Sequence, residues 1–214
     1  QCRYDAAMTA TTPPGTLPPA RERKLLAIAA REFAMAGFEG ASLNKVIRAC
    51  GMSKSSFYHY FDSKQALFDH VIDKAAAALA HDLDAPEPMS LKGPEFWPRL
   101  ETFVAHALPT VAKPSWYADL GKLFYLPDVS AEHSAAMRRL LAGANRWVQS
   151  VLETGRACGA VRRDLPASLQ AELAFALLQT LDRWSVANMA TMKPAQRRRI
   201  ATAQLALLRR LLAP

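Results

Sequence analysis

One short segment concentrates the side chains that could do chemistry. Residues 53–64 read Ser-Lys-Ser-Ser-Phe-Tyr-His-Tyr-Phe-Asp-Ser-Lys, with hydroxyl, cationic and aromatic groups closely interleaved. On a helix, Phe57 and Phe61 lie on one side, so the polar side chains and Tyr58 point elsewhere. A small helical core with a polar face would explain the two phenylalanines. The exposed hydroxyls, cations and tyrosines instead favour contact with DNA, whose phosphates and base edges such groups recognise.

The individual side chains suit different parts of a DNA duplex. Lys54 can reach guanine or a phosphate, and Ser56 can bond a base edge. Tyr58 offers its ring to a thymine methyl group and its hydroxyl to a phosphate, while His59 could cap the helix or touch phosphate. Free amide groups at a helix start also favour an anion. The predicted DNA-binding residues are Ser42, Ser53, Lys54, Ser55, Ser56, Tyr58, His59, Tyr60 and Lys64.

These side chains need a helix-turn-helix to position them. The pattern predicts short helices from Leu43 to Cys50 and from Lys54 to Tyr60, joined by a turn at Gly51, with Ser42 and Ser53 as N-caps. A preceding helix over 20–36 supplies the third side of a small core. That core is expected to contain Leu25, Phe33, Val46, Phe57 and Phe61.

The stretch from Lys24 to Leu67 resembles the DNA-binding domain of the tetracycline-repressor (TetR) family of bacterial regulators. The matching residues are Ala29-Ala30, Phe33, Gly37-Phe38 and Ser42, then Gly51 to Phe61 with Ser63, Lys64 and Leu67. Ser55 stands where the family usually has Gly, and Phe57 where Leu or Ile is usual. The resemblance covers about a fifth of the chain. It implies an all-helical homodimer that binds a palindromic operator, most often as a repressor, and that a C-terminal ligand releases.

Composition agrees with an all-α fold. Ala, Leu and Arg dominate the 214 residues and β-branched runs are nearly absent. We expect a flexible N-terminal arm over 1–19, a three-helix helix-turn-helix DNA-binding domain over 20–66, and a helical ligand-binding and dimerisation domain over 67–214. Basic residues outnumber acidic ones in 20–64 and 190–214, and the reverse holds over 65–129. The net charge of +8 suits a polyanionic partner such as DNA.

The C-terminal part is predicted to contain helices over 95–108, 115–126, 130–155, 167–189 and 194–212. Prolines, including Pro109, are expected to mark their ends. The last two helices have broad leucine-rich faces that need a partner beyond their own domain. We therefore expect the homodimer to form through them, although packing inside the bundle alone would also explain such faces.

Aromatic residues in the middle helices are candidates for a pocket that binds a small apolar or aromatic molecule. An ordinary aromatic core is the alternative for any one of them. The predicted ligand-binding residues are Trp97, Phe103, His106, Trp116, Tyr117, Phe124, Tyr125, Trp147, Phe175 and Gln179.

Other classes of protein find little support in the sequence. The histidines form no HExxH pair, and no nucleophile elbow or phosphate-binding glycine loop occurs, so no enzyme, cofactor or metal site is expected. Cys2, Cys50 and Cys158 have no CxxC spacing and fit a reducing cytoplasm. No membrane span is expected. A regulator that has no small ligand, being constitutive or controlled by a protein partner, remains the alternative function.

Overall fold

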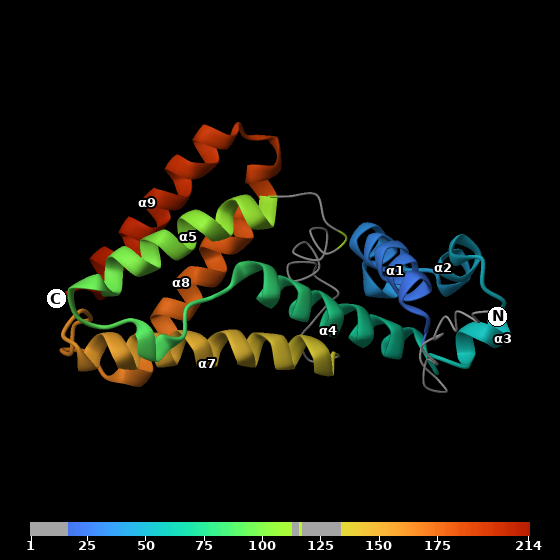
Figure 1. Cartoon of the computed structure of the whole chain (residues 1–214), viewed down its shortest axis with the longest axis horizontal. Coiled ribbons are helices and arrows are strands. Elements are labelled where there is room, and N and C mark those ends of the chain that lie inside the picture. The colour runs from blue at the N-terminus through green and yellow to red at the C-terminus, as the bar shows by residue number, and fades with distance from the viewer. Residues whose placement is uncertain (1–16, 113–115, 117–133) are drawn as a thin grey trace, which may run out of the picture.

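The computed structural model describes residues 17–112, 116 and 134–214. The described part contains helices and no strand, which confirms the all-α class (Figure 1). The helices are α1 (Pro19–Gly40), α2 (Leu43–Cys50), α3 (Lys54–Tyr58), α4 (Lys64–Leu83), α5 (Phe96–Ala112), α7 (Ala135–Ala157), α8 (Ala167–Asn188) and α9 (Pro194–Leu212). Helices α1 to α3 lie at one end of the molecule, and α5, α8 and α9 lie at the other (Figure 1).

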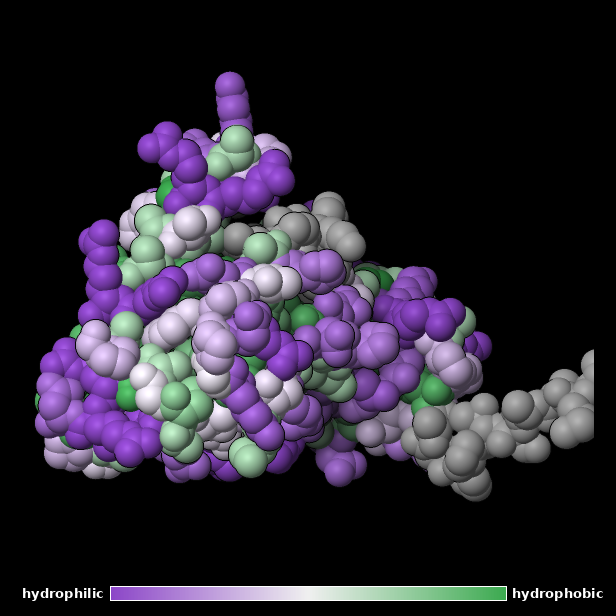
Figure 2. All heavy atoms as spheres, turned by 60° about the vertical axis from the view of Figure 1, so that its left-hand side comes forward, coloured by the Kyte–Doolittle hydropathy of each residue, from purple (hydrophilic) through white to green (hydrophobic). Residues whose placement is uncertain are grey.

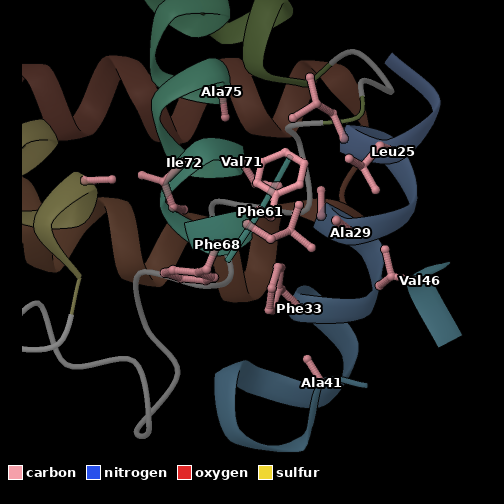
Figure 3. Close-up of a cluster of buried hydrophobic side chains, with 14 of the residues drawn as sticks. Leu25, Ala29, Phe33, Ala41, Val46, Phe61, Phe68, Val71, Ile72 and Ala75 are labelled. Carbon is pink, nitrogen blue, oxygen red and sulfur yellow. The ribbon is translucent and has the colours of Figure 1, made fainter. Parts of the chain in front are cut away.

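The first hydrophobic core fills the space between α1, α2, α3 and α4 (Figure 3). It confirms the predicted cluster, because Leu25, Phe33, Val46, Phe57 and Phe61 are all buried in it. Phe33 and Phe68 meet edge to face with ring centroids 4.9 Å apart. Leu17, at the end of the predicted arm, is also buried in this core.

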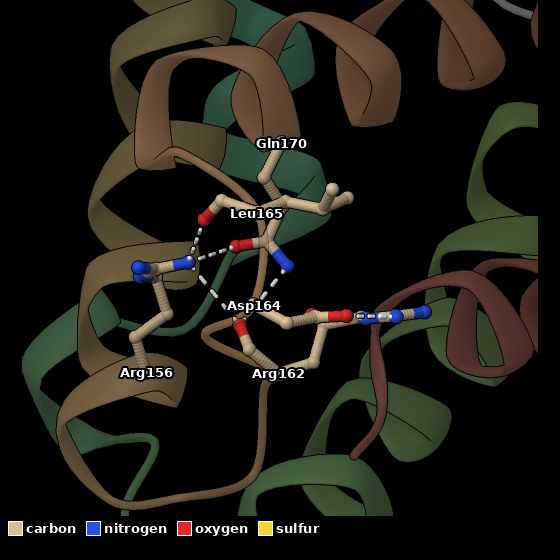
Figure 4. Close-up of polar contacts among 5 residues, drawn as sticks. All are labelled: Arg156, Arg162, Asp164, Leu165 and Gln170. Atoms are coloured by element: carbon tan, nitrogen blue, oxygen red, sulfur yellow. Dashed lines mark hydrogen bonds and ion pairs between the residues drawn. The ribbon is translucent and has the colours of Figure 1, made fainter.

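The second core joins α5, α7, α8 and the end of α9. Phe96, Trp97, Leu152 and Val161 are among its buried members. A set of hydrogen bonds beside this core holds the loop between α7 and α8 (Figure 4). The Arg156 guanidinium donates to the Gln170 side-chain oxygen at 2.8 Å and to the backbone oxygens of Arg162 and Leu165. Because Gln170 is buried, these hydrogen bonds satisfy its side-chain amide, which water cannot reach.

Helix α7 connects the two cores. Its first turns contribute Ala136 and Met137 to the first core, and its later turns contribute Val148 and Val151 to the second. Helix α4, which follows α1 to α3, packs against the start of α7. The part of the chain predicted to bind DNA therefore shares a core with the part predicted to bind ligand.

The junction between α4 and α7 is polar as well as hydrophobic. The buried hydroxyl of Ser134 donates to Asp69 Oδ1 at 2.6 Å, and the same hydroxyl oxygen caps α7 by accepting from Met137 N at 3.0 Å. One turn further along α4, Asp73 accepts from Arg139 at 2.6 Å. Two carboxylates of α4 thus hold the first turns of α7.

Sequence-based boundaries were wrong at α1, α3 and α5. Helix α1 extends across a kink at Gly37 to Gly40, beyond the predicted end at 36. Helix α3 ends at Tyr58 rather than at Tyr60, because His59 and Tyr60 form a tight turn toward Phe61. Helix α5 continues through Pro109 to Ala112 instead of ending near 108. An interior proline removes one backbone hydrogen bond, and the packing of α5 on α4 and α9 holds the helix together in spite of that loss. The predicted helix over 115–126 falls in a stretch of which only Trp116 lies within the described residues.

We expect Ser134→Ala to destabilise the protein more than Ser63→Ala. Both serines cap a helix, and losing a cap costs about 1 kcal/mol. Ser134→Ala also removes the hydrogen bond to Asp69 in a buried setting, which adds about 1 kcal/mol. Urea unfolding of the two variants measures the difference in the free energy of unfolding. Equal losses would show that the Ser134–Asp69 contact contributes nothing.

Candidate DNA-binding surface

Serine caps and one glycine build the helix-turn-helix. Ser42 Oγ accepts from Lys45 N at 3.4 Å to start α2, and Ser53 Oγ accepts from Ser56 N at 3.0 Å to start α3. Between them, Gly51 has φ +71°, a left-handed conformation that glycine adopts without strain. Its N–H bonds the Arg48 carbonyl at 3.0 Å and closes the turn. The predicted caps and turn are thereby confirmed.

Helix α3 is anchored by the aromatic rings on its inner side. Phe57 is fully buried and Phe61 nearly so, with ring centroids 5.5 Å apart. Phe61 lies near Val71 of α4 in the first core (Figure 3). A helix of five residues has little stability of its own. Its orientation therefore comes from the burial of these two rings.

The other side of α3 is open to solvent. Lys54, Ser55 and His59 are exposed, and Tyr58 is 50% exposed with its ring edge against Phe57. Ser56 and Tyr60 are half-buried, and Tyr60 packs against the first core. The structure thus brings most of the predicted set onto one short exposed segment, but it gives Tyr60 a packing role too.

Lys64 is held by contacts within the protein. Its ammonium donates to the Glu39 carbonyl at 2.9 Å and lies 4.8 Å from the centre of the Phe38 ring. It therefore ties the start of α4 to the end of α1. A lysine has three donors, so a phosphate contact is compatible with this tie, but replacing Lys64 would disturb the fold as well as the surface.

Helix α2 presents polar side chains that the sequence reasoning missed. Asn44, Lys45 and Arg48 are exposed, while Val46 and Ile47 between them are buried. Lys45 is 72% exposed and lies 3.6 Å from Glu32. In helix-turn-helix proteins the first helix crosses the DNA backbone. The polar residues that flank the buried pair within 44–48 could therefore have identified these side chains as candidates for DNA contact.

An ion-pair network links α1 to α4 behind this surface. The carboxylate of Glu22 accepts from His70 Nε2 at 2.9 Å and pairs with Lys74 at 2.9 Å. Partial burial raises the pKa of Glu22, but the hydrogen bonds and positive charges of Lys74 and His70 outweigh it and the net pKa is lowered. At neutral pH, Glu22 is therefore ionised and holds the two helices together.

Cys50, at the end of α2, is a half-buried thiol. Burial raises its pKa, and the positive charge of nearby Lys24 only partly opposes this. A thiol with a raised pKa is a poor nucleophile.

The structure separates the predicted ligand-binding residues into several groups. Trp97, Phe103, Trp147 and Phe175 gather at the second core, where Phe103 and Trp147 have ring centroids 5.8 Å apart. The indole N–H of Trp97 donates to the Ala160 carbonyl at 3.0 Å, and that of Trp147 donates to the Pro86 carbonyl at 3.1 Å. These bonds to the backbone give both tryptophans a packing role.

Three further predicted ligand-binding residues lie within the described part of the chain. Trp116 packs against the first core, and His106 and Gln179 are exposed. Tyr117, Phe124 and Tyr125 lie outside the described residues. Whether the whole set lines one pocket stays a prediction.

Two further observations concern chemistry and membranes. Within the described residues, no group of three or more His, Cys, Asp or Glu side chains is placed to hold a metal ion. Over the same part of the chain, no helix combines the length and the apolar character needed to cross a bilayer.

Comparison with known proteins places this surface in context. Residues 25–71 match the family described as bacterial regulatory proteins, tetR family. An uncharacterized HTH-type transcriptional regulator, YdgC of Bacillus subtilis (strain 168), is 40% identical over 50 residues. That match spans 23% of this chain and 26% of the relative, so only about a quarter of YdgC is covered.

Solved structures show the same fold over nearly the whole chain. A putative tetR family transcription regulator from Shewanella sp. PV-4 has a TM-score of 0.68 at 18% identity, covering 91% of this chain and 98% of that one. FadR from Bacillus subtilis, solved in complex with stearoyl-CoA, has a TM-score of 0.66 at 15% identity, covering 86% and 96%.

The relatives that share the helix-turn-helix are named as transcriptional regulators and not as enzymes, in agreement with the absence of catalytic motifs. The matched residues are those that form α1 to α4, the turn at Gly51 and the buried rings behind α3. Residues 25–71 of the chain are thus similar to the helix-turn-helix region of the tetR family of bacterial regulatory proteins.

Proposed function

We propose that the protein is a transcriptional repressor that binds a palindromic operator as a homodimer. The observation that carries this proposal is the exposed face of α3, with Lys54, Ser55 and Tyr58 directed outward and Phe57 locked behind them. The second helix of such a motif enters the major groove, where cations and hydroxyls reach phosphates and base edges. A reducing cytoplasm is the compartment that suits this function.

Dimer formation is supported by the surface of the last two helices. Four large hydrophobic side chains remain exposed there: Leu169, Leu173 and Trp184 on α8, and Leu207 on α9, each between 41% and 52% exposed. On α8, these residues recur at helical spacing and form one stripe. A second copy of the chain would bury this surface, and the dimer would then carry two α3 helices, one for each half of a palindromic operator.

Release by a small apolar or aromatic molecule is the second part of the proposal. The aromatic contact between Phe103 of α5 and Trp147 of α7 includes a side chain of α7 itself. Helix α7 in turn is bonded to α4 through Asp69 and Asp73. A ligand that binds one arrangement of α7 better than another would shift α4 and the spacing of the two α3 helices. The alternative is a regulator without a small ligand, constitutive or controlled by a protein partner.

Selection of bound sequences from random DNA tests the proposed DNA-binding function. A homodimer should enrich a palindrome whose half-sites lie about 34–36 Å apart, or a multiple of one helical turn. Enrichment of a single half-site, or of no sequence, would contradict the proposal. Titrating the selected operator complex with compounds that raise the melting temperature then tests release. Tight ligands that leave operator affinity unchanged would favour the ligand-free alternative.

Two substitutions on α3 should have different effects on binding. Lys54→Ala should weaken binding to all sequences and lower the salt slope by about one, because it removes one phosphate neutralisation. Tyr58→Ala should alter the preference among operator variants by about 1–3 kcal/mol at the position that it reads. Fluorescence anisotropy on specific and random DNA at several salt concentrations measures both. Lys92→Ala, an exposed lysine in the connection before α5, is the matched control.

The contrary outcomes for these variants are distinct. If Lys54→Ala behaves like Lys92→Ala, Lys54 makes no DNA contact. If Tyr58→Ala loses affinity equally on specific and random DNA, Tyr58 contacts the backbone and reads no base.

A charge placed in the exposed hydrophobic stripe should prevent dimer formation. We expect Leu173→Glu and Leu207→Glu to give monomers in analytical ultracentrifugation, because an unpaired carboxylate would be buried in the interface. Met89→Glu is the control, since Met89 is an exposed hydrophobic residue, at 71%, outside α8 and α9. A dimer that persists in both variants would place the interface elsewhere.

A further inference from the structure

A groove of about 630 Å³ lies along the line of contact between α5 and α9. Helix α5 contributes Val104 and Ala105 to its wall, and α9 contributes the positions that follow one side of the helix from Arg198 to Ala213. Phe103, which packs on Trp147, is not part of the lining. The groove is thus separate from the aromatic group proposed above as a ligand pocket. Figure 2 turns this end of the molecule toward the viewer and shows pale and green residues interspersed with purple ones.

Small side chains leave the groove open. Ala105 on α5 and Thr202 and Ala206 on α9 are too short to fill the space between the two helices. Val104 and Leu205 provide branched aliphatic surface, and the lining contains no aromatic ring. Such a wall suits a flexible aliphatic chain, which gains free energy in proportion to the apolar area that it buries.

The charges of the groove are unbalanced. Arg209 is paired with Glu101 at 3.1 Å and lies 5.9 Å from the Trp97 ring, so these two charges offset each other. Arg198 and Arg210 are exposed and make no ion pair within the described residues. No acidic residue occurs from 190 to 214. The groove lining therefore has an excess of positive charge, with Arg198, Arg209 and Arg210 against Glu101.

The end of the groove at Arg198 is the more favourable place for an anion. Arg198 lies in the first turns of α9, where the helix dipole is positive and no acidic residue offsets it. A carboxylate there would receive two parallel hydrogen bonds from the guanidinium. From Arg198 to Arg209 the helix rises about 17 Å. A chain bound at Arg198 would therefore run along Leu205 and end near Trp97.

We propose that the groove binds one long-chain aliphatic carboxylate as a monomer, with its carboxylate on Arg198 and its chain between α5 and α9. This site goes beyond the proposed operator binding and does not depend on it. A neutral chain of the same length lacks the charge contact, and a cationic one is repelled by the two unpaired arginines.

Calorimetric titration with dodecanoate, kept below its micellar concentration, tests the proposal. We expect one dodecanoate per chain, and about tenfold or more weaker binding of dodecanol and dodecyltrimethylammonium. Arg198→Gln should weaken dodecanoate about tenfold, and Ala206→Leu should do so by filling the groove. Their matched controls are Arg199→Gln and Ala203→Leu, exposed positions on α9 that do not line the groove. The controls should bind as the wild type does.

The position of the chain can be read from tryptophan fluorescence. A bromine at the far end of dodecanoate should quench Trp97, and Trp97→Phe should lose most of the quenching. Quenching that is lost in Trp147→Phe instead would place the ligand in the aromatic group and overturn the proposal. Equal binding of dodecanoate and dodecanol, or no effect of both Arg198→Gln and Ala206→Leu, would also overturn it. Binding only to anionic phospholipid vesicles would show that a membrane surface, and not a monomeric carboxylate, is the partner.

Discussion

The burial of Phe57 against α1, α2 and α4 is the constraint on which the DNA-binding end depends. A helix of five residues cannot hold its own shape, yet α3 must present a defined set of polar groups. With Phe57 fully buried and Phe61 beside it, the helix has one orientation in which both rings avoid water. Lys54, Ser55 and Tyr58 then face outward as a consequence. Phe33, Phe38 and Phe68 form a second group of ring contacts in the same core, between α1 and α4.

That core does not stop at the end of the helix-turn-helix. Because Ala136 and Met137 of α7 are buried in it, the DNA-binding end and the C-terminal helices are packed as one body at this point. Helix α7 continues into the second core, so a displacement of this helix at one core would also move its residues in the other core. The carboxylates of Asp69 and Asp73 add polar bonds with defined geometry to this path. The proposed coupling between a C-terminal ligand and the α3 helices would therefore pass through both α4 and α7.

The two ends of the molecule differ in the chemical character of their exposed surfaces. At the first core, polar groups cover the exterior of α3 and leave it suited to an anionic partner. At the second core, α8 carries exposed leucines, and α9 carries unpaired arginines that line the groove beside α5. The hydrophobic stripe suits a second copy of the chain, and the groove beside α5 suits a smaller amphiphilic anion. One small helical domain therefore offers different chemistry on each of its faces.

Local signals in the sequence determined the helices and the DNA-reading segment. The serine caps, the left-handed Gly51 and the helical spacing of apolar residues act within a few positions, so the boundaries of α2, α8 and α9 could be read closely from the sequence. Residue type alone also placed Phe57 and Phe61 inside. Pro109 was misread because its local preference was outweighed by the packing of α5 on its neighbours.

Only the tertiary structure decided which distant side chains meet. The bonds of Ser134 to Asp69, of Trp97 to Ala160 and of Lys64 to Glu39 join positions 25 or more residues apart. No periodic pattern records such pairings, because each depends on how whole helices cross. The aromatic residues of the middle helices looked alike in the sequence, but packing divided them between two cores. The groove between α5 and α9 likewise exists only because short side chains on two separate helices face each other.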